Sequence, residues 1–470
     1  MSSAAPPLLR NVVARPRVVL LNPPASQPVL RDNYCGFQAK ASYLWPPIDL
    51  LVQSGWLARD FTSSVVDAIA ENLTPRKALS RVLAAKPDVV LMLSSGATFL
   101  DDAAFARGVR EARPDATLIA SLSHLVQPSL EYLEQFPWMD GVLNDYTSPD
   151  LRDALLGQPH GPELVRRGDG PRDAKRKPRP LSYPMPRHEL FPLDSYSMPL
   201  GWKGQFSTVL SGYGCAHSCS FCTGSAISYR RRPREDVLAE LELLRSRGIH
   251  NVFFVDYTFT SSRRYVLELC REMARMKPRF RWTGFGRVEQ LDEEMILALK
   301  ASGCDLLQIG VESADDAVLA RYKKGFTVSQ VRTAFARCRE LGLRTLGFFI
   351  IGLPGESRQS IKETIQLAMD LDPDLASFSV PTPDPGTSLL DEAHERGVLG
   401  LEPSQVLSTV GPTLPAEGLT DKEIRGLREE AIRRFYLRPS FLLRQVRSLR
   451  SFEDLKDRAL NAVELLRKAH

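Results

Sequence analysis

Short apolar runs alternate with helix-like segments from residue 16 to about residue 157. The apolar runs, such as RVVLLNPP and PDVVLMLSS, end at polar or small residues, and amphipathic segments such as PRKALSRVLAAK separate them. This alternation predicts a parallel sheet covered on both faces, a doubly wound α/β domain spanning residues 1–157. Ligands of such sheets bind at the carboxyl ends of the strands, here near Asn22, Ala68, Ser94 to Gly96 and Ser121 to His124.

Residues 158–204 lose this pattern and are dense in proline, arginine and lysine. Proline disfavours a regular helix, so the segment is expected to be a linker between domains. The basic run Lys175 to Lys177 leaves two interpretations open, a solvated stretch of the linker and a phosphate-binding patch.

Six further strand-helix repeats fill residues 205–390 and predict a partial parallel (β/α)6 barrel, whose chemistry belongs at the carboxyl ends of its strands. Residues 391–470 turn helical and predict a C-terminal helical cap. Its last segment is basic and amphipathic. That character fits a helix packed on the barrel, and it also fits contact with a membrane surface.

Composition narrows the class of protein. The 470 residues are 43% hydrophobic, enough for several cores, and a net charge of +5 with 25% charged residues gives no argument for a nucleic-acid partner. No secretion signal and no apolar run near the roughly 20 residues of a membrane span are visible, so a cytoplasmic protein is expected.

Three of the seven cysteines form one tight cluster, Cys215, Cys219 and Cys222, in a C-x-x-x-C-x-x-C loop. Three thiolates on one loop can ligate three irons of a four-iron cluster and leave the fourth iron open to a substrate. Two alternatives are a zinc site completed by His217, and an electron-carrier cluster completed by Cys270 or Cys304. The cysteines outside the loop, Cys35, Cys270, Cys304 and Cys338, are expected to be small core residues.

The loop GYGCAHSCSFC, followed by VDYTFT, FGRVEQL, GVES, GLPGES and TPDPGTSLL, resembles the radical SAM (S-adenosylmethionine) superfamily from about Phe206 to Leu390. The resemblance implies a 4Fe-4S cluster on the three cysteines and a SAM site. It places these residues at SAM: Phe221, Asp256, Arg287, Gly310, Glu312 and Leu353. Arg287 and Glu312 suit the charged groups and ribose of SAM, although each alone could be half of a structural ion pair. The run Arg230 to Arg232 either steers an anionic substrate or is a solvated approach to a helix.

The order of doubly wound domain, linker, barrel and helical tail resembles the cobalamin-binding radical SAM enzymes. That resemblance implies cobalamin contacts at Trp45, Trp56, Ser95 and Ser123. No histidine precedes His124, so the D-x-H-x-x-G loop that supplies an imidazole to cobalt elsewhere is absent. Side chains at Ser121 to His124 and Asn144 to Tyr146 replace glycines of the family pattern. The domain therefore either binds cobalamin or only binds substrate and braces the barrel.

The resemblance implies an enzyme that cleaves SAM reductively to a deoxyadenosyl radical, with cobalamin-dependent methylation of an unactivated carbon as the leading reaction. The alternative is cobalamin-free rearrangement, cyclisation or carbon-carbon bond formation with a vestigial first domain. A non-catalytic carrier that retains the loop is a third reading. The expected partners are a small-molecule substrate, with isoprenoids and other lipids among the options, and a reducing donor such as flavodoxin or ferredoxin. No residue is singled out as a catalytic acid or base.

Overall fold

The computed structural model describes residues 8–9, 15–26, 29–31, 36–38, 43–96, 98–123, 125, 128–169, 180–198, 202, 204–384, 386–397, 414, 416 and 418–447. These residues fall into two compact units, one that contains Leu44–Ser197 and one that contains residues 204–397 and 418–447. Several residues named above lie outside the described ranges: Cys35, His124, Lys175 to Lys177 and the segment after residue 447.

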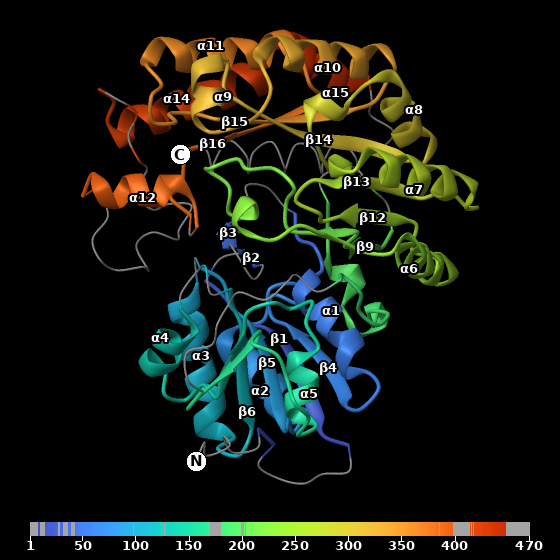
Figure 1. Cartoon of the computed structure of the whole chain (residues 1–470), viewed down its shortest axis with the longest axis vertical. Helices are drawn as coiled ribbons and strands as arrows, with labels where there is room; N and C mark the ends of the chain where they lie inside the picture. Colours follow the sequence, from blue (N-terminus) through green and yellow to red (C-terminus); the bar gives the residue numbers. More distant parts are fainter. Residues whose placement is uncertain are drawn as a thin grey trace. The chain divides into compact units, whose positions relative to one another are not determined.

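The first unit is built on a six-stranded sheet in the order β4-β1-β5-β6-β7-β8 (Figure 1). Its parallel strands are β1 (Arg17–Asn22), β4 (Thr62–Asp67), β5 (Val89–Leu93), β6 (Thr117–Ser121) and β7 (Gly141–Leu143). Its helices are α1 (Ile48–Leu57), α2 (Pro75–Ala84), α3 (Phe99–Ala112), α4 (Ser129–Gln135) and α5 (Asp150–Leu155). A hairpin joins β2 (Val29–Arg31) to β3 (Gly36–Gln38).

The strand order confirms the predicted doubly wound domain. Counted along the chain, the five parallel strands stand in the order 2-1-3-4-5, so the connections run in opposite directions from β1. Because such crossovers are right-handed, the helices fall on both faces of the sheet. The direction reverses between β1 and β5, and the carboxyl ends of these two strands are where a ligand of this fold is expected.

Part of the Pro/Arg-rich segment packs as a component of the first unit. The edge strand β8 (Leu164–Arg166) pairs antiparallel with β7, beyond the boundary at residue 157 that composition predicts. Further on, a Cβ on Gly55 of α1 would lie 2.4 Å from the carbonyl oxygen of Pro184, and the Arg187 amide donates to Ser54 Oγ at 2.9 Å. Backbone contacts of this kind leave no periodic apolar pattern, which is why composition alone suggests a free linker.

The second unit holds an all-parallel sheet in the order β16-β15-β14-β13-β12-β9, which follows the sequence from one edge to the other. The strands are β9 (Phe206–Val209), β12 (Asn251–Phe254), β13 (Arg281–Gly286), β14 (Cys304–Glu312), β15 (Thr345–Ile350) and β16 (Leu375–Ser379). The connecting helices are α6 (Arg234–Ser246), α7 (Arg263–Arg275), α8 (Glu293–Ala301), α9 (Asp316–Arg321), α10 (Val328–Glu340) and α11 (Arg358–Leu371). Since β9 and β16 are both edges, the barrel is open, as predicted.

Helices α12 (Ser388–Glu395), α14 (Asp421–Tyr436) and α15 (Pro439–Arg447) follow the sheet and confirm the predicted helical C-terminal region. α14 begins at a capping box of Thr420 and Glu423. Its buried side chains recur at helical spacing, and the hydroxyl of Tyr436 donates to the carbonyl of Ala376 on β16 at 2.6 Å. Within the described part of the chain, no helix has both the length and the apolar character needed to cross a membrane.

Candidate active site

The cysteine loop projects from the carboxyl end of β9, the strand at one edge of the second sheet. A short hairpin of β10 (Gly212–Tyr213) and β11 (Arg230–Arg231) closes the loop at its base. Gly214 enters the loop with a φ of +73°, and a Cβ there would lie 2.6 Å from the carbonyl oxygens of Ile227 and Ser228. Only glycine meets both demands, so the base of the loop depends on it.

Backbone hydrogen bonds fix the middle of the loop. The Cys222 amide donates to the Cys219 carbonyl at 3.1 Å, and the Ser220 amide donates to the carbonyl of Tyr322, the residue after α9, at 3.1 Å. The Ser220 carbonyl accepts from the amide of Ser388, at the start of α12, at 2.7 Å. The loop is therefore held by two elements that lie more than 100 residues further along the chain.

The three thiols lie in a partly buried place: Cys219 is buried, and Cys215 and Cys222 are half-buried. Cys219 is 7% exposed, and Cys215 Sγ lies 3.6 Å from the hydroxyl of Thr258. Burial raises the pKa of Cys222 to about 11, and the neighbouring thiols of Cys215 and Cys219 add to the rise. Buried thiolates so close together need compensating positive charge, which cluster iron supplies with one thiolate per iron.

A single ion would need a different arrangement. Among the described residues, no three His, Cys, Asp or Glu side chains surround one point in the way that ligands of one ion must. The thiolates of a four-iron cluster each bind a different iron and do not have to converge in this way. The three cysteines of the loop are the residues that would hold the cluster that the sequence resemblance implies.

The other described cysteines, Cys270, Cys304 and Cys338, are buried core residues, as the sequence predicts. Burial raises the pKa of Cys270 and of Cys338 to about 12. Cys304 begins β14 and pairs with Trp282 near the start of β13, at the amino end of the sheet. At about 3.3 Å per residue, the nine residues of β14 separate Cys304 from the carboxyl edge by about 26 Å, so it cannot complete a cluster on the loop.

Arg287, the first residue after β13, points its guanidinium at the loop. It is 6% exposed, and its Nη1 donates to Cys219 Sγ at 3.2 Å. Its Nε donates to the Glu289 carboxylate at 2.5 Å, and its Nη2 donates to the carbonyl of Lys324. Three of the five N–H groups of this guanidinium thus meet protein acceptors.

Glu312 ends β14 and forms a buried ion pair with Lys324, whose Nζ lies 2.7 Å from Glu312 Oε1. The strand shifts register between Gly310 and Glu312, and Glu312 has a φ of +71°. A Cβ on Gly310 would lie 2.4 Å from Glu312 Oε1 and 2.8 Å from Lys324 Nζ. Gly310 therefore leaves room for the ion pair.

Lys324 is the residue of this region that the sequence analysis did not identify. Its ammonium also lies 5.5 Å from the ring centroid of Phe221, which precedes the last cysteine of the loop. Lys324 thus touches Glu312 and Phe221 with its side chain and Arg287 with its carbonyl. Its partner Glu312 lies twelve residues earlier, across the short helix α9, so no helical or strand spacing signals the pair.

Asp256 lies beneath the start of the loop. It is 2% exposed, and its carboxylate accepts from the amide of Ser211 at 2.7 Å and from the hydroxyl of the same residue. Burial raises the pKa of Asp256. These contacts tie the end of β12 to the chain that enters the loop.

Leu353 lies in the turn after β15, and a buried carboxylate that the sequence analysis gave no role holds this turn. Glu356 Oε2 accepts from the amides of Gly352 and Leu353 at 3.0 and 2.9 Å, and Oε1 accepts from the hydroxyl of Ser313 at 2.6 Å. Burial raises the pKa of Glu356 to about 7. Because Ser313 directly follows Glu312, Glu356 joins the ends of β14 and β15.

His217 and the arginine run after the loop have structural surroundings. His217 Nδ1 lies 3.9 Å from Glu289, and burial together with the charge of Arg287 lowers the pKa of His217. Arg230 stacks over Tyr213 at 4.5 Å, and Arg231 stacks over Tyr265 at 4.2 Å.

Arg232 is 1% exposed and pairs with Glu240 of α6. The buried pair of Arg232 with Glu240 contradicts a solvated position for that residue, whereas Arg230 and Arg231 are half-buried and each stacks on an aromatic ring. The steering of an anionic substrate by Arg230 and Arg231 stays a prediction.

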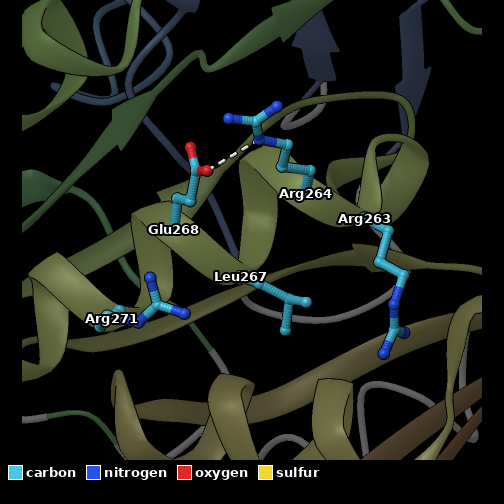
Figure 2. Close-up of a pocket in the computed structure, with 5 residues that line it drawn as sticks. All are labelled: Arg263, Arg264, Leu267, Glu268 and Arg271. Carbon is cyan, nitrogen blue, oxygen red and sulfur yellow. Dashed lines mark hydrogen bonds and ion pairs between the residues drawn. The ribbon is translucent and has the colours of Figure 1, made fainter.

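A surface hollow of about 350 Å³ lies on α7, lined by Arg263, Arg264, Leu267, Glu268 and Arg271 (Figure 2). Arg264 donates to Glu268 at 3.0 Å, and Arg263 pairs with Asp292 at 2.8 Å. Two of its three arginines are thus engaged with carboxylates, and the hollow contains no thiol.

The four residues expected at cobalamin lie on different elements of the first unit: Ser95 follows β5, Ser123 follows β6, Trp45 precedes α1, and Trp56 lies in the last turn of α1. Ser95 and Ser123 are both 0% exposed, and Ser95 Oγ lies 3.1 Å from the hydroxyl of Thr98. The Trp56 indole N–H donates to the carbonyl of Thr147 at 3.2 Å, and Trp45 is half-buried.

Beside these residues lies a network of buried charge that the sequence analysis did not identify. Arg31 and Asp102, whose side chains are both 0% exposed, pair at 2.8 Å. Arg31 also donates to Asn22 Oδ1 at 3.0 Å. Asn22 donates to Asp67 at 2.9 Å, and Asp67 accepts from the Tyr196 hydroxyl at 2.8 Å. The network ties the ends of β1 and β4 together.

Known proteins resemble both the sequence and the fold. Residues 209–368 match the radical SAM superfamily. An uncharacterized methyltransferase of Pyrococcus horikoshii is 27% identical over 85% of this chain and 90% of its own length. An anaerobic magnesium-protoporphyrin IX monomethyl ester cyclase of Rubrivivax gelatinosus is 23% identical over 88% of this chain and 78% of its own length.

Among solved structures, the radical SAM methyltransferase TsrM of Kitasatospora setae, with cobalamin and a [4Fe-4S] cluster bound, superposes with a TM-score of 0.68. The match covers 97% of this chain and 99% of TsrM. At 18% identity it shows that the fold is similar. A doubly wound unit, an open parallel barrel and a helical C-terminal region are therefore the architecture of a known enzyme.

Proposed function

We propose, from the premise that residues 209–368 are a radical SAM domain, that this chain cleaves SAM reductively and transfers a methyl group to carbon. One observation carries the proposal. Arg287 contacts Cys219 of the loop with one nitrogen and Lys324 with another, and Lys324 pairs with Glu312. A continuous run of contacts thus joins the cluster loop to a buried pair of opposite charges.

An iron-sulfur cluster on Cys215, Cys219 and Cys222 would supply the electron that breaks a carbon-sulfur bond of SAM, giving methionine and a deoxyadenosyl radical. The protein's part is to hold SAM beside the loop. A reducing donor of the flavodoxin or ferredoxin kind would supply this electron to the cluster, and we expect the reaction at the carboxyl edge of the second sheet.

The Glu312–Lys324 pair fits the zwitterionic end of SAM. SAM carries an ammonium and a carboxylate on one carbon. In the protein, the ammonium of Lys324 and the carboxylate of Glu312 lie 2.7 Å apart, so each can pair with the group of opposite charge on SAM. We assign the SAM ammonium to Glu312 and the SAM carboxylate to Lys324, so that one internal ion pair opens into two with the ligand. Such contacts fix the ligand in a reactive position.

The remaining proposed SAM residues frame this pair. Phe221 and Leu353 offer apolar surfaces for the adenine, and Gly310 leaves the space in which the charges meet. Asp256 contributes by holding the entrance of the loop, and Arg287 by facing the cluster. Arg287 also retains N–H groups for SAM.

For the first unit we propose cobalamin binding at the carboxyl ends of β1, β5 and β6. Support comes from the strand order, from the likeness to a structure that holds cobalamin, and from relatives that cover both units of this chain. The cobalt would take no histidine from a D-x-H-x-x-G loop, which the sequence lacks. Trp45 and Trp56 would offer ring faces, and Ser95 and Ser123 would line the strand ends.

We propose a small molecule as the substrate and the cytoplasm as the location of the protein. The test is anaerobic turnover of cluster-loaded protein with methyl-labelled SAM and hydroxocobalamin, measuring iron, corrinoid, deoxyadenosine and S-adenosylhomocysteine together. Methylation is expected to give both nucleoside products, because one SAM is the radical source and another recharges the corrinoid. Deoxyadenosine with neither S-adenosylhomocysteine nor labelled product would overturn methyl transfer.

A second candidate function is radical cyclisation, which the 23% identity to a magnesium-protoporphyrin ester cyclase favours. This relative spans both units of the chain, as the methyltransferase relative does. The same turnover experiment separates the two reactions. Cyclisation forms deoxyadenosine without transferring the methyl label.

A further inference from the structure

We propose that Arg287 tunes the reduction potential of the cluster through its hydrogen bond to Cys219, acting as a positioning and electrostatic residue for the metal centre as well as for SAM. The inference rests on the proposed function, since it needs the cluster on the loop. Its basis is the contact of Arg287 Nη1 with Cys219 Sγ at 3.2 Å, made by a side chain that is 6% exposed.

The guanidinium has little freedom to turn away from the sulfur. Glu289 holds Nε, the Lys324 carbonyl holds Nη2, and the centre of the guanidinium lies 5.2 Å from the ring centroid of Phe326. The Arg287 amide also donates to the hydroxyl of Thr260 at 3.1 Å, which anchors its backbone. Rotating the guanidinium would break charge-assisted hydrogen bonds in a buried place.

The three cysteines are therefore unequal. Cys219 receives a charged N–H donor, whereas the described contact of Cys215 is a neutral hydroxyl, that of Thr258, at the longer distance of 3.6 Å. Reduction adds one negative charge to the cluster and its sulfurs. A cation and a hydrogen bond directed at one ligand sulfur stabilise the reduced form and raise the potential.

This role differs from a contact that SAM alone would use. If Arg287 acted only on SAM, the potential of the cluster measured without SAM would not depend on it. If it acted only in packing, its loss would lower the stability of the fold and leave the potential of any assembled cluster unchanged. The potential in the absence of SAM is thus the property that separates these roles.

The experiment is a redox titration of the full-length, cluster-loaded protein without SAM, followed by optical and paramagnetic resonance spectra. Arg287→Met removes the charge and the donor, and Arg287→Gln removes the charge and leaves a neutral amide on a side chain too short to reach Cys219. We expect Arg287→Met to lower the equilibrium constant for reduction about tenfold, which is about 59 mV toward negative potential for one electron. Arg287→Gln should shift the potential in the same direction.

The matched control is Arg264→Met, the same substitution at an arginine of the α7 hollow whose side chain is 91% exposed (Figure 2). It should keep the wild-type potential. Iron content and thermal unfolding are recorded for every variant. If neither neutral variant retains iron, the potential of Arg287→Lys is measured instead. Its shorter side chain cannot keep all three contacts, so its potential should also be more negative than that of the wild-type protein.

A wild-type potential in an iron-loaded Arg287 variant would overturn the inference. Failure of the proposed function has a different signature. In that case the wild-type protein itself assembles no four-iron cluster, or assembles one and forms no deoxyadenosine from SAM.

Discussion

The two sheets use buried charge at the carboxyl ends of their strands in different ways. In the first unit, Arg31 and Asp102 pair with both side chains fully buried, and Arg31 donates further to Asn22 and to neighbouring carbonyl groups. In the second unit, Arg287 and Lys324 lie beside the cysteine loop, and Arg287 spends one of its donors on a thiol sulfur.

The difference shows that buried charge does not by itself mark a reactive site. The Arg31 network satisfies its members with one another and holds strand ends together, which is a structural role. Arg287, in contrast, donates to the sulfur of Cys219, one of the three cysteines assigned to the cluster. Single substitutions in the Arg31 network and around the cysteine loop test this contrast.

The largest effect is expected at the loop itself. Replacing any of Cys215, Cys219 or Cys222 by alanine should abolish the four-iron cluster, because one iron loses its protein ligand. Iron and sulfide analysis after anaerobic reconstitution measures this. Cys270→Ala is the control and should keep the full iron content, since that thiol lies on the buried face of α7. Retained iron in the Cys219 variant would contradict the assignment.

In the first unit, breaking the buried pair should destabilise the fold. Asp102→Asn leaves the Arg31 guanidinium buried with one carboxylate fewer, and we expect the free energy of unfolding of this unit to fall by about 3–5 kcal/mol. Denaturant unfolding followed by circular dichroism gives the value. Arg107→Met, which breaks an exposed pair with Glu111, should cost less than about 1 kcal/mol. Equal losses in the two variants would argue against a structural role for the network.

Glu356 should give the second unit a measurable pH dependence. Burial raises its folded-state pKa from the ordinary 4.5 to about 7, so the folded protein binds this proton where the unfolded chain does not. The unfolding free energy should therefore fall as pH rises from 4.5 to 7, by about 3 kcal/mol, and then level off.

The measurement is the difference in slope between the wild-type protein and Glu356→Gln over that pH range. Comparing slopes cancels the contributions of other buried carboxylates. Parallel curves for the two proteins would show that Glu356 is ionised throughout.

The smallest effect concerns the Glu312–Lys324 pair. Lys324→Met should weaken SAM binding about tenfold, close to 1.4 kcal/mol, because it removes the cation assigned to the SAM carboxylate. Decarboxylated SAM sharpens the measurement by titration calorimetry. The wild-type protein should prefer SAM over this analogue, and Lys324→Met should lose that preference. A preference that survives the substitution would assign the carboxylate to another residue.

The sequence alone determined the architecture and the identity of the metal loop. Alternating apolar and amphipathic runs predicted both parallel sheets, because a strand buried on two faces needs a continuous apolar run and its crossover needs a helix. The spacing of Cys215, Cys219 and Cys222 is local, so it was visible without a fold. Arg287, Gly310 and Glu312 were likewise predicted from short segments of sequence, FGRVEQL and GVES.

Only the tertiary structure decided which side chains these residues meet. Lys324 and Glu356 act through partners on other elements, and Arg31 meets Asp102 across 71 residues of chain. No periodicity reports such pairs, because their separation in sequence depends on how strands and helices pack. The solvated position expected of Arg232 was wrong for the same reason. Its partner Glu240 lies on α6, and the partner of Arg231, Tyr265, lies on α7, so both contacts form only when the hairpin at the base of the loop packs on these helices.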